Sequence, residues 1–216
     1  MSVRGCAYEV GAIVSQAPSF GSLEAAEQTA DSHLLEAVSL AVKEDQLAPI
    51  YQLRVIDQVE IAESPVWLQL RLMKSGIRPV NNIVDVTNYY LLLYGQPMHA
   101  FDYDRLTNHT IVVDRAEVDV PFVTLDGVER TLSADDIVIK DADQVIALAG
   151  VMGGAETEVT DQTRRVLLET AVFNPEQIRL TSKRFGLRSE SSARFEKGIN
   201  FCLLYTSDAA DDSPPV

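Results

Sequence analysis

A single acidic residue interrupts an apolar stretch late in the chain. Glu169 stands within Val166-Leu-Leu-Glu-Thr-Ala-Val-Phe173, a run whose β-branched and aromatic residues predict a strand. A carboxylate in such a strand is costly to bury unless it has partners or faces a cavity. The residues alone favour an ion pair with a nearby arginine. The functional alternative is a hydrogen-bond acceptor inside a pocket.

A lone histidine follows the predicted end of a helix. His99 stands in Gly95-Gln-Pro-Met-His-Ala-Phe-Asp102, where a loop residue is able to face a pocket. Imidazole titrates near neutral pH and is able to act as a base, although a hydrogen-bonded structural histidine is the more common case. Asp102 and Asp104 suggest a metal only weakly, because a hard cation needs more grouped oxygen ligands. We therefore expect no metal.

Polar side chains also stand inside a helix predicted over residues 83–94. Asn82 is placed to cap this helix, and Gly95 ends it. The helix is apolar nearly all round, which predicts that it is buried. Thr87 and Asn88 therefore need partners or line a wet cavity. A hydrogen bond within the helix is an equal alternative for Thr87.

Two clusters of small residues are further candidates. Gly153 and Gly154 resemble a phosphate loop only weakly, since neither a following Lys-Ser/Thr pair nor a βα unit accompanies them. They suit a close approach of the backbone to a ligand. Ser189 and Ser191 lack the partners of a nucleophilic serine. Either serine is placed to cap a short helix that ends near Lys197.

Basic side chains gather before residue 200, among them Arg184, Arg188 and Arg194. Such side chains are able to contact nucleic-acid phosphates, and these contacts weaken with salt. A solvated helix face is an equal alternative. The net charge of −14 argues against a chain coated in positive charge, although it leaves room for a local basic patch.

The remaining pattern mixes helices and strands without βαβ repetition. This predicts an α+β fold with mixed and antiparallel sheets and packed helices. Residues 15–33 are predicted to form a linker, and residues 122–132 a hairpin with a two-residue turn at Asp126-Gly127. Strands are predicted over 38–42, 50–56, 111–113, 136–140, 144–149 and 165–173, and further helices over 1–14, 64–75 and 174–184.

Composition limits the classes of protein. The apolar fraction of 46% is enough for a real core. No apolar run approaches the roughly 18 residues of a transmembrane helix, and no signal peptide is visible, so no membrane partner is expected. Cys6 and Cys202 are too few for a disulfide framework, which fits a cytoplasmic protein.

Four stretches of the chain form one collinear set of motifs. They are RPVNNIVDVTNYYLLLYGQPMHAFD (78–102), AGVMGG (149–154), LLETAVFNP (167–175) and FGLRSESSARFEKG (185–198). Together they resemble the editing module in the beta subunit of bacterial phenylalanyl-tRNA synthetase. Four matches in order are far more specific than one motif. The resemblance runs from Met1 to about Asn200.

The resemblance implies an enzyme that corrects its own errors. A pocket shaped for phenylalanine rejects tyrosine poorly by binding alone when the extra hydroxyl fits, so a second site checks the product. The implied local activity is hydrolysis of tyrosyl-tRNA(Phe), in support of ATP-dependent charging of tRNA(Phe) by the whole enzyme. The implied partners are tRNA(Phe) and an alpha subunit, in a heterotetramer. ATP and Mg²⁺ belong to the whole enzyme, and no cofactor is implied for this chain.

The resemblance also assigns roles to the candidate residues. Glu169 would recognise the tyrosine hydroxyl and His99 would bind substrate or place water, and we group these two as the catalytic residues. Ser189 and Ser191 stand where the family usually has Thr and Ala, so Ser191 adds bulk that bears on editing strength. The implied substrate-binding residues are Thr87, Asn88, Gly153, Gly154, Ser189 and Ser191, and the implied tRNA-binding residues are Arg184, Arg188 and Arg194.

Domain limits follow from the same resemblance. Residues 1–37 are expected to be the remnant of a first domain plus linker, with Met1 an internal methionine of a partial gene, and residues 38–200 the editing module. Residues 202–216 resemble a translated sequencing adapter, with a native disordered tail as the alternative. For the whole chain, two other hypotheses stay open. One is a structural or tRNA- or alpha-subunit-binding module with editing weakened or lost, and the other is a metal-dependent hydrolase.

Overall fold

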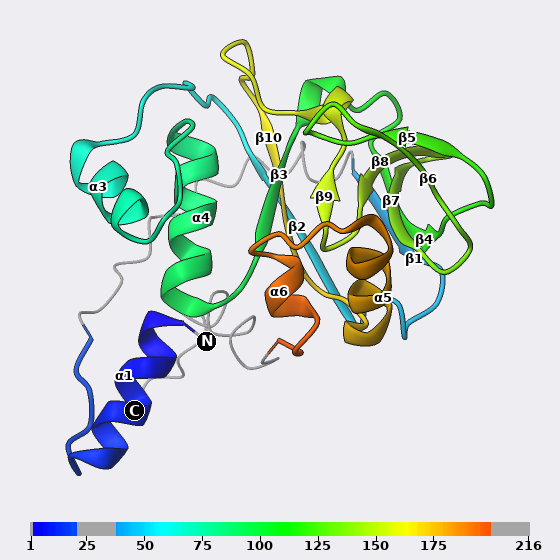
Figure 1. Cartoon of the computed structure of the whole chain (residues 1–216). Helices are drawn as coiled ribbons and strands as arrows, with labels where there is room; N and C mark the ends of the chain where they lie inside the picture. Colours follow the sequence, from blue (N-terminus) through cyan, green and yellow to red (C-terminus); the bar gives the residue numbers. More distant parts are fainter. Residues whose placement is uncertain (1, 21–37, 200–216) are drawn as a thin grey trace, which may run out of the picture.

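Two β-sheets share one hydrophobic core, and helices pack around them (Figure 1). The computed structural model describes residues 2–20 and 38–199. The mixture of sheets and packed helices confirms the α+β class. The expected tail at 202–216 and most of the expected linker lie outside the described residues.

The larger sheet has five strands in the order β1-β4-β7-β8-β9. Strand β1 pairs with β4 in parallel, and the other neighbours are antiparallel. Most of the side chains on its inner face are apolar, so the sheet forms one wall of the core. Its strands are β1 (Ser39–Val42), β4 (Thr110–Arg115), β7 (Ile137–Asp141), β8 (Gln144–Leu148) and β9 (Met152–Gly153).

The smaller sheet is antiparallel and has three strands. Strand β10 (Val166–Val172) lies in the middle, between β2 (Ile50–Ile56) and β3 (Met98–Asp102). Leu167 and Ala171 of β10 point into the core shared with the larger sheet, whereas Val166 belongs to a small cluster on the opposite face. This alternation follows from the period of two along a strand.

The helices confirm most of the predicted positions. Helix α5 begins at Pro175, and the Asn174 side chain caps it by accepting hydrogen bonds from the backbone N–H groups of Glu176 and Gln177. Gly186 ends this helix with a left-handed φ of 65°. The helices are α1 (Val3–Ile13), α3 (Val66–Lys74), α4 (Asn82–Tyr94), α5 (Pro175–Phe185) and α6 (Ser192–Phe195), with 3₁₀ turns η1 (Tyr103–Arg105) and η2 (Ala155–Thr157). Within the described residues, no helix is long and apolar enough to cross a bilayer.

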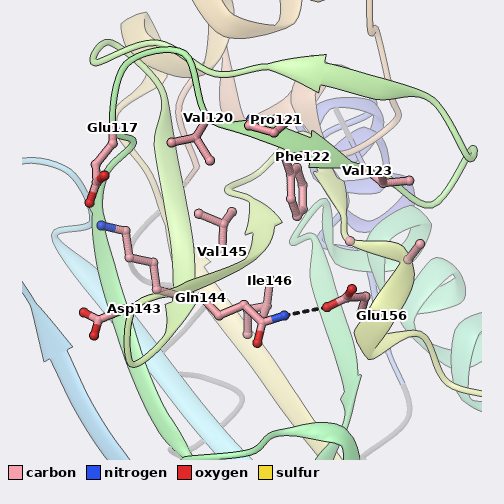
Figure 2. A pocket seen from close by; sticks show the side chains of 13 residues that line it. Glu117, Val120, Pro121, Phe122, Val123, Asp143, Gln144, Val145, Ile146 and Glu156 are labelled. Atoms are coloured by element: carbon pink, nitrogen blue, oxygen red, sulfur yellow. Dashed lines mark hydrogen bonds between the residues drawn. The ribbon is translucent and has the colours of Figure 1, made fainter.

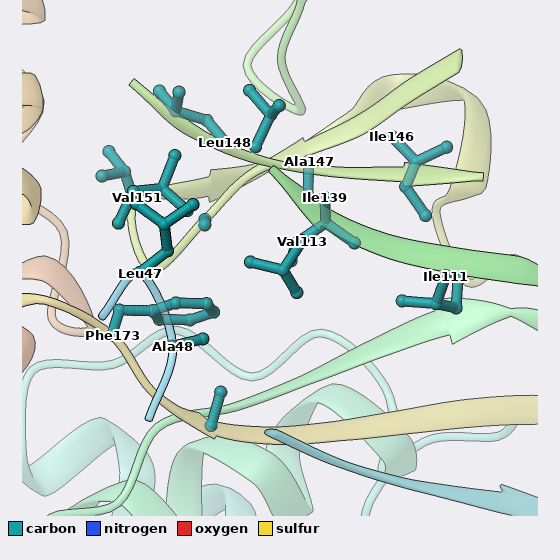
Figure 3. Packing of buried hydrophobic residues seen from close by; sticks show 14 of the residues in the cluster. Leu47, Ala48, Ile111, Val113, Ile139, Ile146, Ala147, Leu148, Val151 and Phe173 are labelled. Atoms are coloured by element: carbon teal, nitrogen blue, oxygen red, sulfur yellow. The ribbon is translucent and has the colours of Figure 1, made fainter. Parts of the chain in front are cut away.

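The core fills the space between the two sheets (Figure 3). Phe173, the residue after β10, belongs to the same core cluster as Ile139 and Leu148 of the five-stranded sheet. Ile178 of α5 and Phe195 of α6 belong to the same cluster, so both helices close the core at one end. Burial on this scale is the main force that holds the two sheets together.

Helix α4 differs from the expectation in two ways. Its cap is Asn81, whose side chain accepts a hydrogen bond from Val84 N at 2.9 Å, rather than Asn82. The helix is also not buried all round, since Val86 is 54% exposed. It packs against β3, α3 and α1 on part of its surface only, so apolar residues on the remaining surface stay accessible.

Two local predictions were wrong. His99 lies in strand β3 rather than in a loop, because the backbone pairs with β10 immediately after Pro97. The hairpin formed by β5 (Pro121–Val123) and β6 (Glu129–Thr131) has a five-residue loop, residues 124–128, rather than a two-residue turn. Gly127 adopts a φ of 73° in that loop and donates its N–H to Thr124 O.

A buried carboxylate fixes the loop that leads into β4. Asp141, at the end of β7, is 2% exposed. Its Oδ2 accepts hydrogen bonds from the N–H groups of Thr107 and Asn108, and its Oδ1 accepts one from Thr110 N, at 2.7, 3.0 and 2.9 Å. Bonds from three backbone donors to one carboxylate satisfy groups that would otherwise lose water without compensation.

We expect Asp141→Ala to lower the free energy of unfolding by about 3 kcal/mol, because three backbone N–H groups lose a charged acceptor. Urea denaturation followed by circular dichroism measures this change. The matched control is Asp143→Ala, an exposed aspartate in the same turn, which should change stability by less than about 0.5 kcal/mol. Equal stability of the two variants would refute the anchoring role of Asp141.

Candidate functional site

A row of side chains crosses the three-stranded sheet and includes both predicted catalytic residues. Glu169 on β10 is paired with His99 on β3 and with Leu53 on β2. Directly opposed residues in antiparallel strands place their side chains on the same face. Glu169 alternates with Leu168 and shares its face with Leu167 and Ala171, so it points toward the five-stranded sheet.

A small hollow of about 60 Å³ lies where this row meets β8, β9 and α6. It has room for a few water molecules. Four of the predicted site residues border it, namely His99, Gly153, Glu169 and Ser191. The other lining residues are mainly apolar and come from the AGVMGG stretch, from β3, β7 and β8 and from Phe195. The sheet register thus brings together residues that lie far apart in the sequence.

The Glu169 carboxyl is buried, with 5% of the residue exposed. Burial raises the pKa of this carboxyl to about 8, and a hydrogen bond from the Tyr51 hydroxyl opposes part of that rise. The bond joins Tyr51 Oη to Glu169 Oε2 at 3.0 Å. Within the described residues the carboxyl has no arginine partner, so the ion pair favoured by the residues alone is not formed. The site therefore holds a carboxyl that is largely protonated at neutral pH.

The imidazole of His99 is neutral at physiological pH, because burial lowers its pKa to about 4. Its ring lies edge-on to Phe101, with centroids 4.5 Å apart. Gly153 faces the same ring, and a Cβ built there would lie 2.6 Å from His99 Cε1. The glycine therefore makes room for the histidine. A neutral imidazole is suited to orienting a water molecule or a ligand through hydrogen bonds.

The structure does not bring every predicted substrate-binding residue to the hollow. Ser189 supports its wall, since Ser189 Oγ donates to Val151 O at 2.9 Å and accepts from Ser192 N at 3.0 Å. The second bond makes Ser189 the side chain that caps α6. Ser191 occupies the N-cap position without a side-chain bond to the helix. Ser189 therefore acts on the hollow through the backbone of Val151.

Thr87 and Asn88 on α4 do not line the hollow. Thr87 Oγ1 donates to Val84 O at 2.8 Å. This is the hydrogen bond within the helix that the sequence analysis gave as an alternative for Thr87. Ile83, one turn earlier, packs together with Leu168 against the cluster around Val166, on the sheet face opposite Glu169. Helix α4 therefore contacts the three-stranded sheet on the face opposite to the Glu169 side chain.

A second hollow, of about 390 Å³, lies beside β5, β7, β8 and η2 (Figure 2). Phe122, Val145 and Ile146 give it an apolar surface, and acidic side chains such as Glu156 stand at its edge. Gly154 is the predicted site residue that borders it. A Cβ on Gly154 would lie 2.6 Å from Ile146 O and 2.8 Å from Phe122 Cζ, so this glycine serves packing between β8 and the hairpin.

The three arginines predicted to bind tRNA all have acidic partners within the described chain. Arg184 pairs with Asp136, which is 1% exposed, and Arg194 pairs with Glu190 at 2.7 Å. Arg188 lies 3.4 Å from Glu196 and is 72% exposed, which makes it the most accessible of the three. A contact with phosphate at Arg184 or Arg194 would have to compete with these pairs.

The carboxylates at the end of β3 and just after it make structural bonds. Asp102 accepts a hydrogen bond from Thr163 Oγ1 at 2.6 Å, and Asp104 pairs with Arg165. Across the described residues, no group of three or more His, Cys, Asp or Glu side chains is arranged to hold a metal ion.

The sequence did not identify Tyr51 as part of the site. Its contact with Glu169 spans 118 residues and depends on the pairing of β2 with β10. Because pairing between distant strands is not encoded by local pattern, no signal in a single sequence points to it. Gly150 and Phe195 lie within the motif stretches, so the motifs could have identified them as residues that line the hollow.

The buried carboxyl gives stability a defined pH dependence. Glu169 ionises near pH 4.5 in the unfolded chain and near pH 8 in the folded chain. Between these values the unfolded state binds fewer protons, so the free energy of unfolding falls as pH rises. We expect Glu169→Gln to remove this fall. The stability of the variant relative to the unmodified chain should rise across the interval by up to about 1.4 kcal/mol per pH unit.

Urea denaturation at a series of pH values measures this difference. His99 is present in both proteins, so its own titration cancels. Glu158→Gln, at an exposed glutamate, is the control and should give a curve parallel to that of the unmodified chain. A parallel curve for Glu169→Gln would show that the carboxyl is not held neutral in the folded state.

Comparisons with known proteins show which family the chain resembles. A family model described as the B3/4 domain matches residues 47–210. The chain is 52% identical over 214 residues to the phenylalanine–tRNA ligase beta subunit of Streptococcus agalactiae serotype Ia, covering 98% of this chain and 26% of that protein. It is 50% identical to the same subunit from Streptococcus pyogenes serotype M18 over 204 residues, covering 94% and 25%.

A solved structure, an N-terminal fragment of the phenylalanyl-tRNA synthetase beta subunit from Pyrococcus horikoshii, has a TM-score of 0.49 and 13% identity, covering 80% of this chain and 52% of that one. The chain spans about a quarter of the length of the curated relatives it matches, at 26% and 25%. The similarity to the beta subunits confirms the resemblance carried by the four motifs. The chain belongs to the B3/4 domain family, as it occurs in phenylalanine–tRNA ligase beta subunits.

Proposed function

We propose that this chain edits mischarged tRNA as a part of a phenylalanine–tRNA ligase beta subunit. The observation that carries the proposal is the buried Glu169 carboxyl, which shares a hollow with His99 and Ser191. A buried hydrogen-bonding group rejects a ligand that leaves it unpaired. Tyrosine offers a ring hydroxyl to Glu169 and phenylalanine does not, so the site would retain the wrong product and reject the correct one.

The proposed reaction is hydrolysis of the ester bond of tyrosyl-tRNA(Phe). A water oxygen attacks the ester carbonyl carbon, the bond to the ribose oxygen breaks, and that oxygen takes a proton. Tyrosine and free tRNA are the products. His99 is neutral and borders the hollow, so we assign it to holding the water or the aminoacyl group by hydrogen bonds. Its low pKa makes it a weak proton acceptor, so its role is placement.

The wider assignments rest on the family. The proposed editing module covers residues 38–200, and Arg188 is the arginine best placed for contact with tRNA(Phe) because it is exposed. The whole ligase would include an alpha subunit and use ATP and Mg²⁺ to charge tRNA(Phe). Residues Thr87 and Asn88 stay proposed substrate contacts that would require α4 to approach the hollow.

We expect Glu169→Ala to slow deacylation of tRNA(Phe) charged with tyrosine by about 10- to 100-fold, because a hydrogen bond to a buried ionisable group is lost. We expect His99→Ala to slow it as well. The measurement is release of labelled tyrosine from mischarged tRNA, with Glu158→Ala as the control for a remote glutamate.

Unchanged rates in both site variants would remove these assignments. Saturable binding of tyrosine without any hydrolysis by the unmodified chain would instead favour a binding module in which editing is lost. The bulk of Ser191 at the hollow gives that outcome a physical basis. Ser191→Ala should then restore hydrolysis.

A further inference from the structure

The Glu169 carboxyl has a partner on the neighbouring strand that no motif indicated. Tyr51 on β2 donates its hydroxyl to Glu169 Oε2 across 3.0 Å. Tyr51 is paired with Ala171, two residues along β10 from Glu169, so both side chains project from the same face of the sheet. The bond therefore runs diagonally across the pair of strands, a distance that a tyrosine is long enough to span.

Aromatic packing fixes the direction of the Tyr51 ring. Its edge meets the Phe173 ring, with centroids 6.1 Å apart and planes at 66°. Phe173 is 1% exposed and meets Phe195 at 5.1 Å and 67°. Phe195 borders the hollow that Glu169 faces. A continuous row of rings thus joins the Tyr51 ring to the wall of the site, and edge-to-face geometry is directional.

We propose that Tyr51 is the positioning residue of the site, which occupies Oε2 of Glu169 and thereby presents Oε1 alone to the ring hydroxyl of the ligand. The inference rests on the proposed function for its substrate, whereas the hydrogen bond itself is a property of the free chain. Without Tyr51 the carboxyl would be free to rotate, and either oxygen would face the hollow.

The ionisation states of the two groups support this direction of the bond. Burial, followed by the charge of Glu169, raises the pKa of Tyr51 well above its ordinary value, so the phenol stays protonated and remains a donor. Oε2 therefore accepts the hydrogen bond from Tyr51. The titratable groups that face this carboxyl are Tyr51 on β2 and His99 on β3. Because His99 is neutral above about pH 4, it adds no charge in the range where Glu169 titrates.

The test uses Tyr51→Phe, which removes the hydroxyl and keeps the ring against Phe173. The carboxyl carbon of Glu169 is followed by ¹³C NMR during a pH titration of the free chain. The Tyr51 bond lowers the pKa of Glu169, so the midpoint should move to higher pH in Tyr51→Phe. It should stay unchanged in Tyr8→Phe, which alters a tyrosine that is 60% exposed on α1. Equal midpoints in Tyr51→Phe and the unmodified chain would overturn the proposal.

A measurement on the unmodified chain keeps the proposal testable should the variant fail to fold. The ¹³Cζ shift of Tyr51 should change with the midpoint of Glu169, because the two groups share a hydrogen bond. A Tyr51 signal that is flat through that midpoint would overturn the proposal.

The second arm measures deacylation of tyrosyl-tRNA(Phe). Loss of one net hydrogen bond that orients the acceptor should raise KM about fivefold and leave kcat nearly unchanged, since the bond acts on binding of the ring. A fall in kcat with KM unchanged would contradict a positioning role. If the unmodified chain hydrolyses nothing, the proposed function fails, and the NMR titration still decides whether Tyr51 orients Glu169.

Discussion

The site depends on one constraint, the burial of a carboxyl group between two sheets. Glu169 lies on the central strand of its sheet, so its backbone is fixed on both sides. Its side chain faces an interior that is mainly apolar, where a charge is costly. Two features reduce this cost in the folded chain: the carboxyl stays largely neutral, and it accepts one hydrogen bond from Tyr51. The remaining hydrogen-bonding capacity is directed at the hollow, which makes the group sensitive to the ligand that enters.

Strand register controls this arrangement. A shift of one residue in the pairing of β10 with β3 would move the Glu169 side chain to the opposite face, toward the cluster around Val166. Apolar burial of Leu167 and Ala171 on the inner face opposes such a shift. Gly153 adds a second restraint, because a Cβ at this position would clash with the His99 ring as it stands. The same packing that stabilises the fold therefore sets the geometry of the site.

Much of the architecture could be predicted because it is encoded locally. Helix α5 has its capping asparagine, its first-turn proline and its terminal glycine in the sequence, and the structure uses all of them. Strand β3 was missed because Pro97 and the residues around it are typical of a loop, and pairing with β10 overrides that local preference. The burial of α4 was overpredicted, because an apolar composition does not show which surface of a helix a partner covers.

The candidate site was predictable only in part, because the pairing of distant strands is not encoded locally. The motifs supplied His99, Gly153, Glu169 and Ser191, which the structure gathers at one hollow. The residue that orients the carboxyl, Tyr51, becomes visible only when two strands 118 residues apart are paired. The reason for Gly153 also changed, since the close neighbour is a protein side chain rather than a ligand.

The most direct measurement of the central claim is the pH titration of the Glu169 carboxyl by ¹³C NMR with saturating tyrosine and, separately, with phenylalanine. A ring hydroxyl that donates to this carboxyl favours its ionised form, so tyrosine should lower the midpoint from about 8. Phenylalanine should not lower it, because its ring has no donor. Equal midpoints with the two amino acids would contradict the claim that Glu169 tells them apart.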